Sequence, residues 1–133
     1  VKKINVSAAT HVPTFLMPAA EKALGLKEEV EAMQEAFAER RLAIHEGFAS
    51  LPGVVAPRPE GAFYILCDIT GTGLTDMEFA KEALEQAKVQ LIPGSLMKGG
   101  EGLVRISYAT SLENIHEGLR RLRTWLESRG SQG

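Results

Sequence analysis

Arg105 lies in an alternation of apolar and polar residues, Leu103 to Tyr108, that is typical of a β-strand. Its planar guanidinium can hold a carboxylate through two parallel, charge-assisted hydrogen bonds, which fix orientation as well as affinity. The plainer interpretation is a strand arginine at the edge of a sheet that makes a surface ion pair, the more frequent role of a single strand arginine. The strand alone leaves both interpretations open.

Two glycine-containing segments accompany this strand. Residues 59–64 read Pro-Glu-Gly-Ala-Phe-Tyr, and residues 93–95 read Pro-Gly-Ser. We expect Gly61 and Gly94 to adopt backbone conformations closed to other residues, although glycines that simply mark hairpins are equally frequent. Phe63 and Tyr64 are possible walls of a binding site, and one residue of such a pair on an apolar strand usually belongs to the core.

Other motifs are weaker. The Ser-x-x-Lys of residues 95–98 is followed by two glycines instead of a continuing helix, and the glycine spacing of residues 94–99 lacks the Lys-Ser or Lys-Thr of a phosphate loop. His11, His45 and His116 have no Cys, Asp or Glu neighbours at convincing ligand spacing. The sequence therefore predicts neither a nucleotide site nor a metal site.

The apolar periodicity predicts the elements that position Arg105. A helix over residues 13–24 is kinked or delayed by Pro18, and a long amphipathic helix covers 27–50. Expected strands cover residues 54–56, 62–69, 89–92 and 103–108, with 62–69 as a central strand and 95–102 as a loop.

Thr75 begins a capping-box pattern with Glu78, which predicts a helix that places Phe79, Ala83, Leu84 and Ala87 on one face. A last helix starts near Ser111, and residues 128–133 read as a frayed tail. The last helix is expected to bury Ile115, Leu119, Leu122 and Leu126. Together these elements predict an α/β (α+β) two-layer sandwich, with helices covering a small, mostly antiparallel sheet.

Composition limits the classes of function. The chain has 133 residues, 44% hydrophobic and 24% charged, with 15 basic and 17 acidic residues. Neither nucleic acid nor a membrane is an expected partner, because no basic patch is interleaved with aromatic residues and no apolar run is long enough to span a bilayer. The single cysteine, Cys67, favours a buried thiol in a reducing cytoplasm. The absence of an initiator methionine suggests the tail of a longer polypeptide.

Taken in order, the Gly-Ala-Phe-Tyr strand, the Pro-Gly-Ser turn, the Val-Arg-Ile-Ser strand and the closing helix with Arg-Arg-Leu resemble the C-terminal part of class I/II aminotransferases of the aspartate aminotransferase fold type I. The resemblance covers nearly the whole chain. It implies that residues 1–12 are the end of a large domain or a linker, and that residues 13–133 are the small domain.

The resemblance implies that Arg105 binds the α-carboxylate of an amino-acid substrate, and that Gly61, Phe63 and Tyr64 are possible site walls. It implies pyridoxal 5'-phosphate as cofactor, with its lysine before this segment and no catalytic residue within it. Implied partners are an amino acid, a 2-oxo acid, a large cofactor-binding domain and a second subunit. Two other interpretations stay open: a non-catalytic amino-acid-binding or regulatory module, and a fragment of a fold type I lyase or synthase. A role in subunit packing predicts exposed apolar side chains between Val12 and Met33.

Overall fold

The structure is a computed structural model that describes residues 12–130. By its internal contacts the chain divides into two units, residues 1–35 and residues 36–133, and each is described by itself. In the first unit a 3₁₀-helix, Thr14–Leu16, leads into helix α2, Met17–Ala23, and Lys27 then begins helix α3, Lys27–Ala49. Because α2 starts at Met17, Pro18 falls in its first turn, where a missing N–H costs nothing, and the predicted delay is confirmed.

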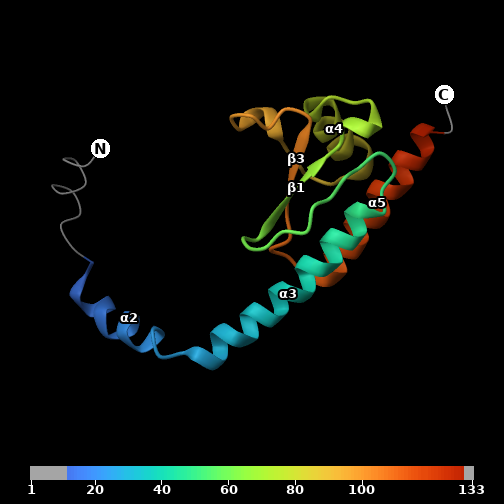
Figure 1. The fold of residues 1–133 in the computed structure, drawn as a ribbon. Helices are drawn as coiled ribbons and strands as arrows, with labels where there is room; N and C mark the ends of the chain where they lie inside the picture. The colour runs from blue at the N-terminus through green and yellow to red at the C-terminus, as the bar shows by residue number, and fades with distance from the viewer. Residues whose placement is uncertain (1–11, 131–133) are drawn as a thin grey trace. The chain divides into compact units, whose positions relative to one another are not determined.

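The second unit contains a three-stranded sheet (Figure 1). Its strands are β1 (Tyr64–Asp68), β2 (Ile92–Pro93) and β3 (Leu103–Ser107), in the order β1-β3-β2, and both pairings are antiparallel. The antiparallel sandwich is therefore confirmed. The central position was assigned wrongly, because β3 and not the strand of residues 62–69 lies in the middle.

Two of the expected strands are shorter than the sequence pattern suggested. Residues 54–56 form only a single bridge, Val55 to Asp68. The strand expected over 62–69 begins at Tyr64, because Ala62 has a left-handed backbone with φ of 64° that no extended strand can include. It ends where Asp68 accepts hydrogen bonds from the backbone N–H and the hydroxyl of Thr70, at 2.8 and 2.6 Å.

Helix α4, Asp76–Glu82, begins with the predicted capping box, in which Thr75 and Glu78 bond reciprocally. A π-helical segment, Ala83–Ala87, continues it and ends at Lys88, whose backbone is left-handed. The wider π turn changes the angular spacing, so Leu84 is 51% exposed instead of facing the core as expected. Residues 89–91 then remain outside the sheet, and the expected strand 89–92 is reduced to Ile92 and Pro93.

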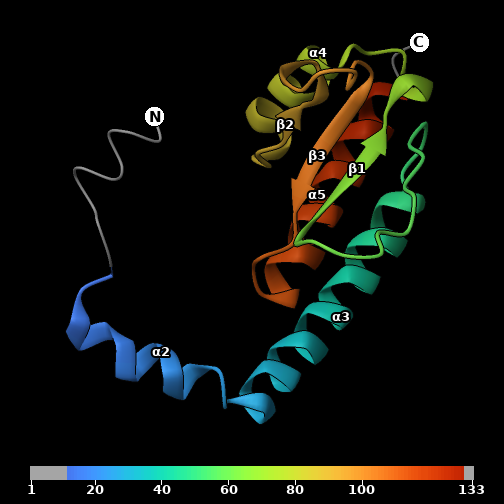
Figure 2. The same cartoon turned by 60° about the vertical axis from the view of Figure 1, so that its left-hand side comes forward.

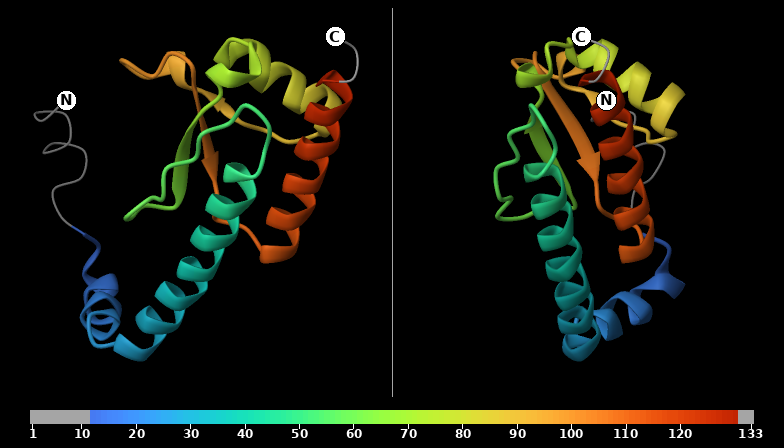
Figure 3. Two further views of the ribbon diagram at one scale, coloured as in Figure 1. Left: turned by 45° about the vertical axis from the view of Figure 1, so that its right-hand side comes forward. Right: turned by 90° about the vertical axis from the view of Figure 1, so that its right-hand side faces the viewer.

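In the second unit, residues 36–49 of helix α3 and helix α5 (Leu112–Gly130) run side by side on one face of the sheet (Figures 2 and 3). Helix α5 buries Ile115, Leu122 and Leu126 as predicted, and Trp125 in addition. The expected frayed tail is wrong as far as Gly130, since Ser128 donates to the carbonyl of Trp125 at 2.7 Å and the helix continues. Residues 131–133 lie outside the described residues.

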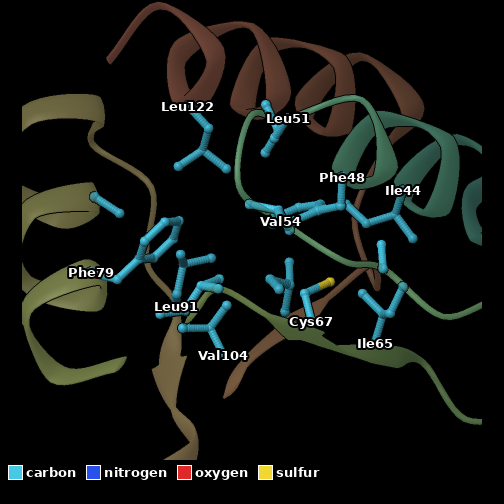
Figure 4. Close-up of a cluster of buried hydrophobic side chains, with 14 of the residues drawn as sticks. Ile44, Phe48, Leu51, Val54, Ile65, Cys67, Phe79, Leu91, Val104 and Leu122 are labelled. Atoms are coloured by element: carbon cyan, nitrogen blue, oxygen red, sulfur yellow. The ribbon is translucent and has the colours of Figure 1, made fainter. Parts of the chain in front are cut away.

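The core fills the space between the sheet and the helices (Figure 4). From the sheet, Ile65, Cys67 and Val104 point toward the helices, and Phe48 and Leu122 approach them from α3 and α5. Burial also raises the pKa of the Cys67 thiol to about 12, so this cysteine stays a neutral, packed side chain, as expected. Every buried apolar side chain of residues 12–130 lies between Ile44 and Leu126.

Candidate functional site

Arg105 lies at the middle of the central strand, on the face of the sheet opposite the core. Its neighbours Val104 and Ile106 are buried, and alternation along the strand therefore turns Arg105 to the other side, where it is half-buried. Leu66 of β1 and Ile92 of β2 stand opposite it in the ladder. Directly opposite residues share a face, so the guanidinium emerges between two aliphatic side chains.

No acidic side chain of residues 12–130 pairs with the Arg105 guanidinium, and it donates no hydrogen bond to another described residue. Asp68 shares the outer face of β1 with Leu66, but its carboxylate accepts from Thr70. These hydrogen bonds from Thr70 lower the pKa of Asp68. The plain surface ion pair considered for Arg105 is thus not formed, and its N–H groups remain available for an anion.

Tyr64, one of the two aromatic residues predicted as walls, lies beside Arg105. The centre of the guanidinium is 5.4 Å from the centroid of the Tyr64 ring, which makes a cation–π contact. The Phe63 ring meets Tyr64 edge-on, with centroids 5.6 Å apart and an interplanar angle of 88°. Phe63 is 55% exposed and Tyr64 is half-buried. The structure therefore brings Tyr64 against Arg105, and Phe63 against Tyr64.

Gly61 differs from its prediction. A methyl group at Gly61 would meet no atom within 4 Å, and the left-handed conformation falls on Ala62 instead. The segment is held by Tyr108, whose hydroxyl donates to the Ala62 carbonyl at 2.9 Å and whose backbone N–H donates to the Phe63 carbonyl at 2.9 Å. This buried tyrosine directly follows β3, although the sequence placed it at the end of that strand, and its partners, 46 and 45 residues earlier, gave no signal in the sequence.

Gly94 differs in another way. Its backbone is not left-handed, but a methyl group there would lie 2.7 Å from the Leu103 carbonyl and would also collide with the Gly100 carbonyl. Close approach of two backbones, and not an unusual φ, therefore requires glycine at this position. The turn after β2 packs directly against the start of β3, the strand that carries Arg105.

Asp76, the first residue of α4, lies in this region and was not predicted as a site residue. It is 6% exposed, and its Oδ2 accepts from the Ser95 backbone N–H at 2.7 Å. The Ser95 hydroxyl, followed by the Ser95 and Gly102 N–H groups, lowers the pKa of Asp76 against the opposing effect of burial. One carboxylate thus links the start of α4 to the segment that follows β2.

The weaker motifs remain apart from Arg105. In the Ser-x-x-Lys motif, Ser95 and Lys98 are exposed, and residues 94–96 form a short 3₁₀-helix. Within residues 12–130, no three His, Cys, Asp or Glu side chains gather as metal ligands would. His11 lies outside the described residues. In the same range, no helix is long and apolar enough to cross a membrane.

Residues 2–122 match the family model described as "Aminotransferase class I and II". An aspartate aminotransferase from Pyrococcus horikoshii is 37% identical over 94% of this chain and 33% of its own length. An aromatic-amino-acid aminotransferase from Thermococcus litoralis is 38% identical over 91% of this chain and 32% of its own length. The chain spans about a third of the curated relatives that it matches.

Solved structures agree with this similarity. An aromatic aminotransferase from Pyrococcus horikoshii superimposes with a TM-score of 0.88 at 38% identity, over 96% of this chain and 35% of that chain. An aspartate aminotransferase from Thermus thermophilus with maleate gives a TM-score of 0.80 at 34% identity, over 92% of this chain and 32% of that chain.

Proposed function

This chain belongs to the class I and II aminotransferases, and we propose that residues 13–133 form the C-terminal small domain of a pyridoxal-phosphate-dependent enzyme that moves an amino group between an amino acid and a 2-oxo acid. Residues 1–12 would be the end of the large domain or a linker. The domain's share of this reaction would be to bind the α-carboxylate and, by closing over the substrate, to exclude water.

The observation that carries the proposal is the free guanidinium of Arg105 on the outer face of the sheet. A carboxylate bound there would meet a cation flanked by Leu66 and Ile92, where reduced access of water strengthens a charge-assisted hydrogen bond. The names of the relatives support a residue that binds the part common to their substrates. Aspartate and aromatic amino acids have different side chains, but both carry the α-carboxylate.

The cofactor would be held elsewhere. Lys22, Lys27, Lys81, Lys88 and Lys98 are the lysines of residues 12–130, and all are exposed. A Schiff base needs an amine enclosed beside the bound substrate, so these side chains do not fit that role. Lys2 and Lys3 lie outside the described residues. We therefore assign no step of the cofactor's chemistry to the described residues and expect the isolated chain to be inactive.

The first unit would contribute to packing against the large domain or a second subunit. Large apolar side chains are exposed along it, as the packing hypothesis predicted, and solvent-facing apolar surface of this kind favours an interface. They are Val12, Phe15, Leu16, Met17, Leu24, Leu26, Val30 and Met33. A homodimer and a cytoplasmic location remain part of this proposal, the latter because the one cysteine, Cys67, is a buried free thiol.

Replacement of Arg105 in the full-length enzyme tests the proposed function. Arg105→Ala should lower kcat/KM for L-aspartate or L-phenylalanine, whichever reacts faster. The loss should correspond to about 2–5 kcal/mol of transition-state binding energy, because the substrate carboxylate loses its half-buried, charged partner. Arg105→Lys should recover only part of this loss, since an ammonium group cannot bind in the bidentate manner.

An amine without a carboxylate is the matched control. 2-Phenylethylamine lacks only the α-carboxylate of phenylalanine, so its slow reaction with the cofactor should be the same in the natural enzyme and in Arg105→Ala. Equal losses for the amine and the amino acid would indicate general damage to the site. An unchanged kcat/KM for every amino acid tested would contradict the proposed role of Arg105.

A further inference from the structure

Tyr64 and Arg105 are diagonal neighbours across the β1–β3 ladder. Tyr64 stands opposite Ser107, and Arg105 lies two residues before Ser107 on the same face. Diagonal pairs are within reach only of long or aromatic side chains, and here the guanidinium carbon lies 5.4 Å from the ring centroid. Among the described residues, this ring is the one group that makes an electrostatic contact with the Arg105 guanidinium.

An aromatic partner and a carboxylate partner differ in whether they leave the N–H groups of the guanidinium free. A carboxylate would occupy the N–H groups at the edge of the guanidinium, which are the groups that a substrate carboxylate needs. A ring attracts the cation through its π-electrons and takes up none of these N–H groups. The chain also keeps the acidic residue Asp68, on the outer face of β1, bonded to Thr70.

We propose that Tyr64 is a positioning residue for Arg105: its ring holds the guanidinium in place while leaving the N–H edge free to bind the α-carboxylate. This inference rests on the proposed function of Arg105. In this role Tyr64 affects the binding of the α-carboxylate, which all amino-acid substrates share. A residue of the site wall would instead recognise the substrate side chain. The effect of changing Tyr64 is therefore the same for all amino-acid substrates.

Phe63 completes the arrangement. Its edge-on contact restricts rotation of the Tyr64 ring, with centroids 5.6 Å apart. The Tyr64 hydroxyl makes no hydrogen bond within residues 12–130, so the contact with Arg105 depends on the ring and not on the hydroxyl. Tyr64→Phe is thus a conservative variant that keeps the contact, whereas Tyr64→Leu keeps apolar volume and removes the ring.

The test compares these two variants in the full-length enzyme. Tyr64→Leu raises KM for L-aspartate and L-phenylalanine by a similar factor, about 2- to 30-fold, while kcat changes less than KM. Tyr64→Phe stays within about twofold of the natural enzyme. The reaction with 2-phenylethylamine, which has no carboxylate, is unchanged in both variants. Thermal unfolding confirms that each variant is folded, and Tyr64→Met, with the same expectation, replaces Tyr64→Leu if the latter does not fold.

A double-mutant cycle separates this inference from the proposed function. In an Arg105→Ala background, Tyr64→Leu causes no further rise in KM, because the cation that the ring holds is absent. An equal rise in both backgrounds overturns the inference, as does a loss in Tyr64→Phe as large as that in Tyr64→Leu. If Arg105→Ala weakens amino-acid binding but Tyr64→Leu does not, the inference fails while the proposed function stands. If Arg105→Ala itself has no effect, the proposed function fails.

Discussion

Asp76 connects helix α4 to the turn before β3, the strand of Arg105, through a single side chain. It is the one buried charged residue of residues 12–130, and it accepts from the Ser95 N–H at 2.7 Å. A buried carboxylate is stabilised only while it has such donors, and a substitution that leaves donors without an acceptor is costly. Asp76 therefore ties α4 to the turn that precedes β3.

Replacement of Asp76 by asparagine should change how stability depends on pH. The Ser95 hydroxyl and N–H lower the pKa of Asp76 in the folded state, so its stabilising contribution is present above the unfolded pKa of about 3.9 and is lost as pH falls through the lower folded value. We expect Asp76→Asn to lower the free energy of unfolding by about 1–2 kcal/mol at neutral pH and by less at about pH 2. Urea denaturation at both pH values measures this difference, and a cost that does not depend on pH would contradict it.

At the residue scale, the sequence predicted groups whose partners are near in the chain. Thr75 and Glu78 form the expected capping box because both residues belong to one helical turn. The contact of Asp76 with Ser95 spans 19 residues and depends on how α4 meets the turn. Likewise, the alternation predicted a strand through Arg105, but the contact of Arg105 with Tyr64 required the register of β1 against β3. Local spacing contains no information on such register.

The element that supports β3 is the turn between β2 and β3, where two backbones meet at Gly94 and Gly100. A methyl group on Gly94 would lie 2.7 Å from the Leu103 carbonyl, and carbonyl groups of this backbone cannot move away as a flexible side chain could. Gly94→Ala should therefore lower the free energy of unfolding by about 1–3 kcal/mol. It should also raise KM in the full-length enzyme, because a displaced turn shifts the strand of Arg105.

Gly61→Ala is the matched control for Gly94→Ala. A methyl group at Gly61 meets no atom within 4 Å, and its φ is not left-handed, so stability should stay within about 0.5 kcal/mol of the natural chain. Thermal and urea unfolding measure both variants. Equal effects at the two glycines would show that the close approach at Gly94 does not limit substitution.

At the element scale, the helices were easier to predict than the strands. The periodicity of the apolar residues in α5 is enough to predict a helix, and residues 112–130 form one. The run of residues 89–92 has the composition of a strand, but only Ile92 and Pro93 find partners on β3. A strand exists only where a ladder partner is available, and residues 89–91, which follow the left-handed Lys88, have none.

For the whole molecule, the two units differ in how they are stabilised. None of the buried residues lies between residues 12 and 35, whereas the core of the second unit is continuous from Ile44 to Leu126. The apolar periodicity of the first helices predicted a buried face, but it could not show whether this chain or another part of the protein covers that face. Stability of the 133-residue chain should therefore reside in the second unit.

Removal of residues 1–35 tests this division. Because every buried apolar side chain of residues 12–130 would be retained, we expect the free energy of unfolding to fall by less than about 1 kcal/mol, with cooperative unfolding preserved. Self-association should decrease, since large exposed side chains such as Phe15 and Leu24, 79% and 87% exposed, are removed. Urea denaturation followed by circular dichroism measures the free energy of unfolding, and sedimentation velocity measures self-association.

Ile44→Ala in the shortened chain is the control, because it opens a cavity at a side chain that is only 4% exposed. It should lower the free energy of unfolding by about 2–5 kcal/mol, which would show that the assay detects damage to the core. A loss as large as that of Ile44→Ala on removal of residues 1–35 would mean that the first unit contributes to the fold of the second.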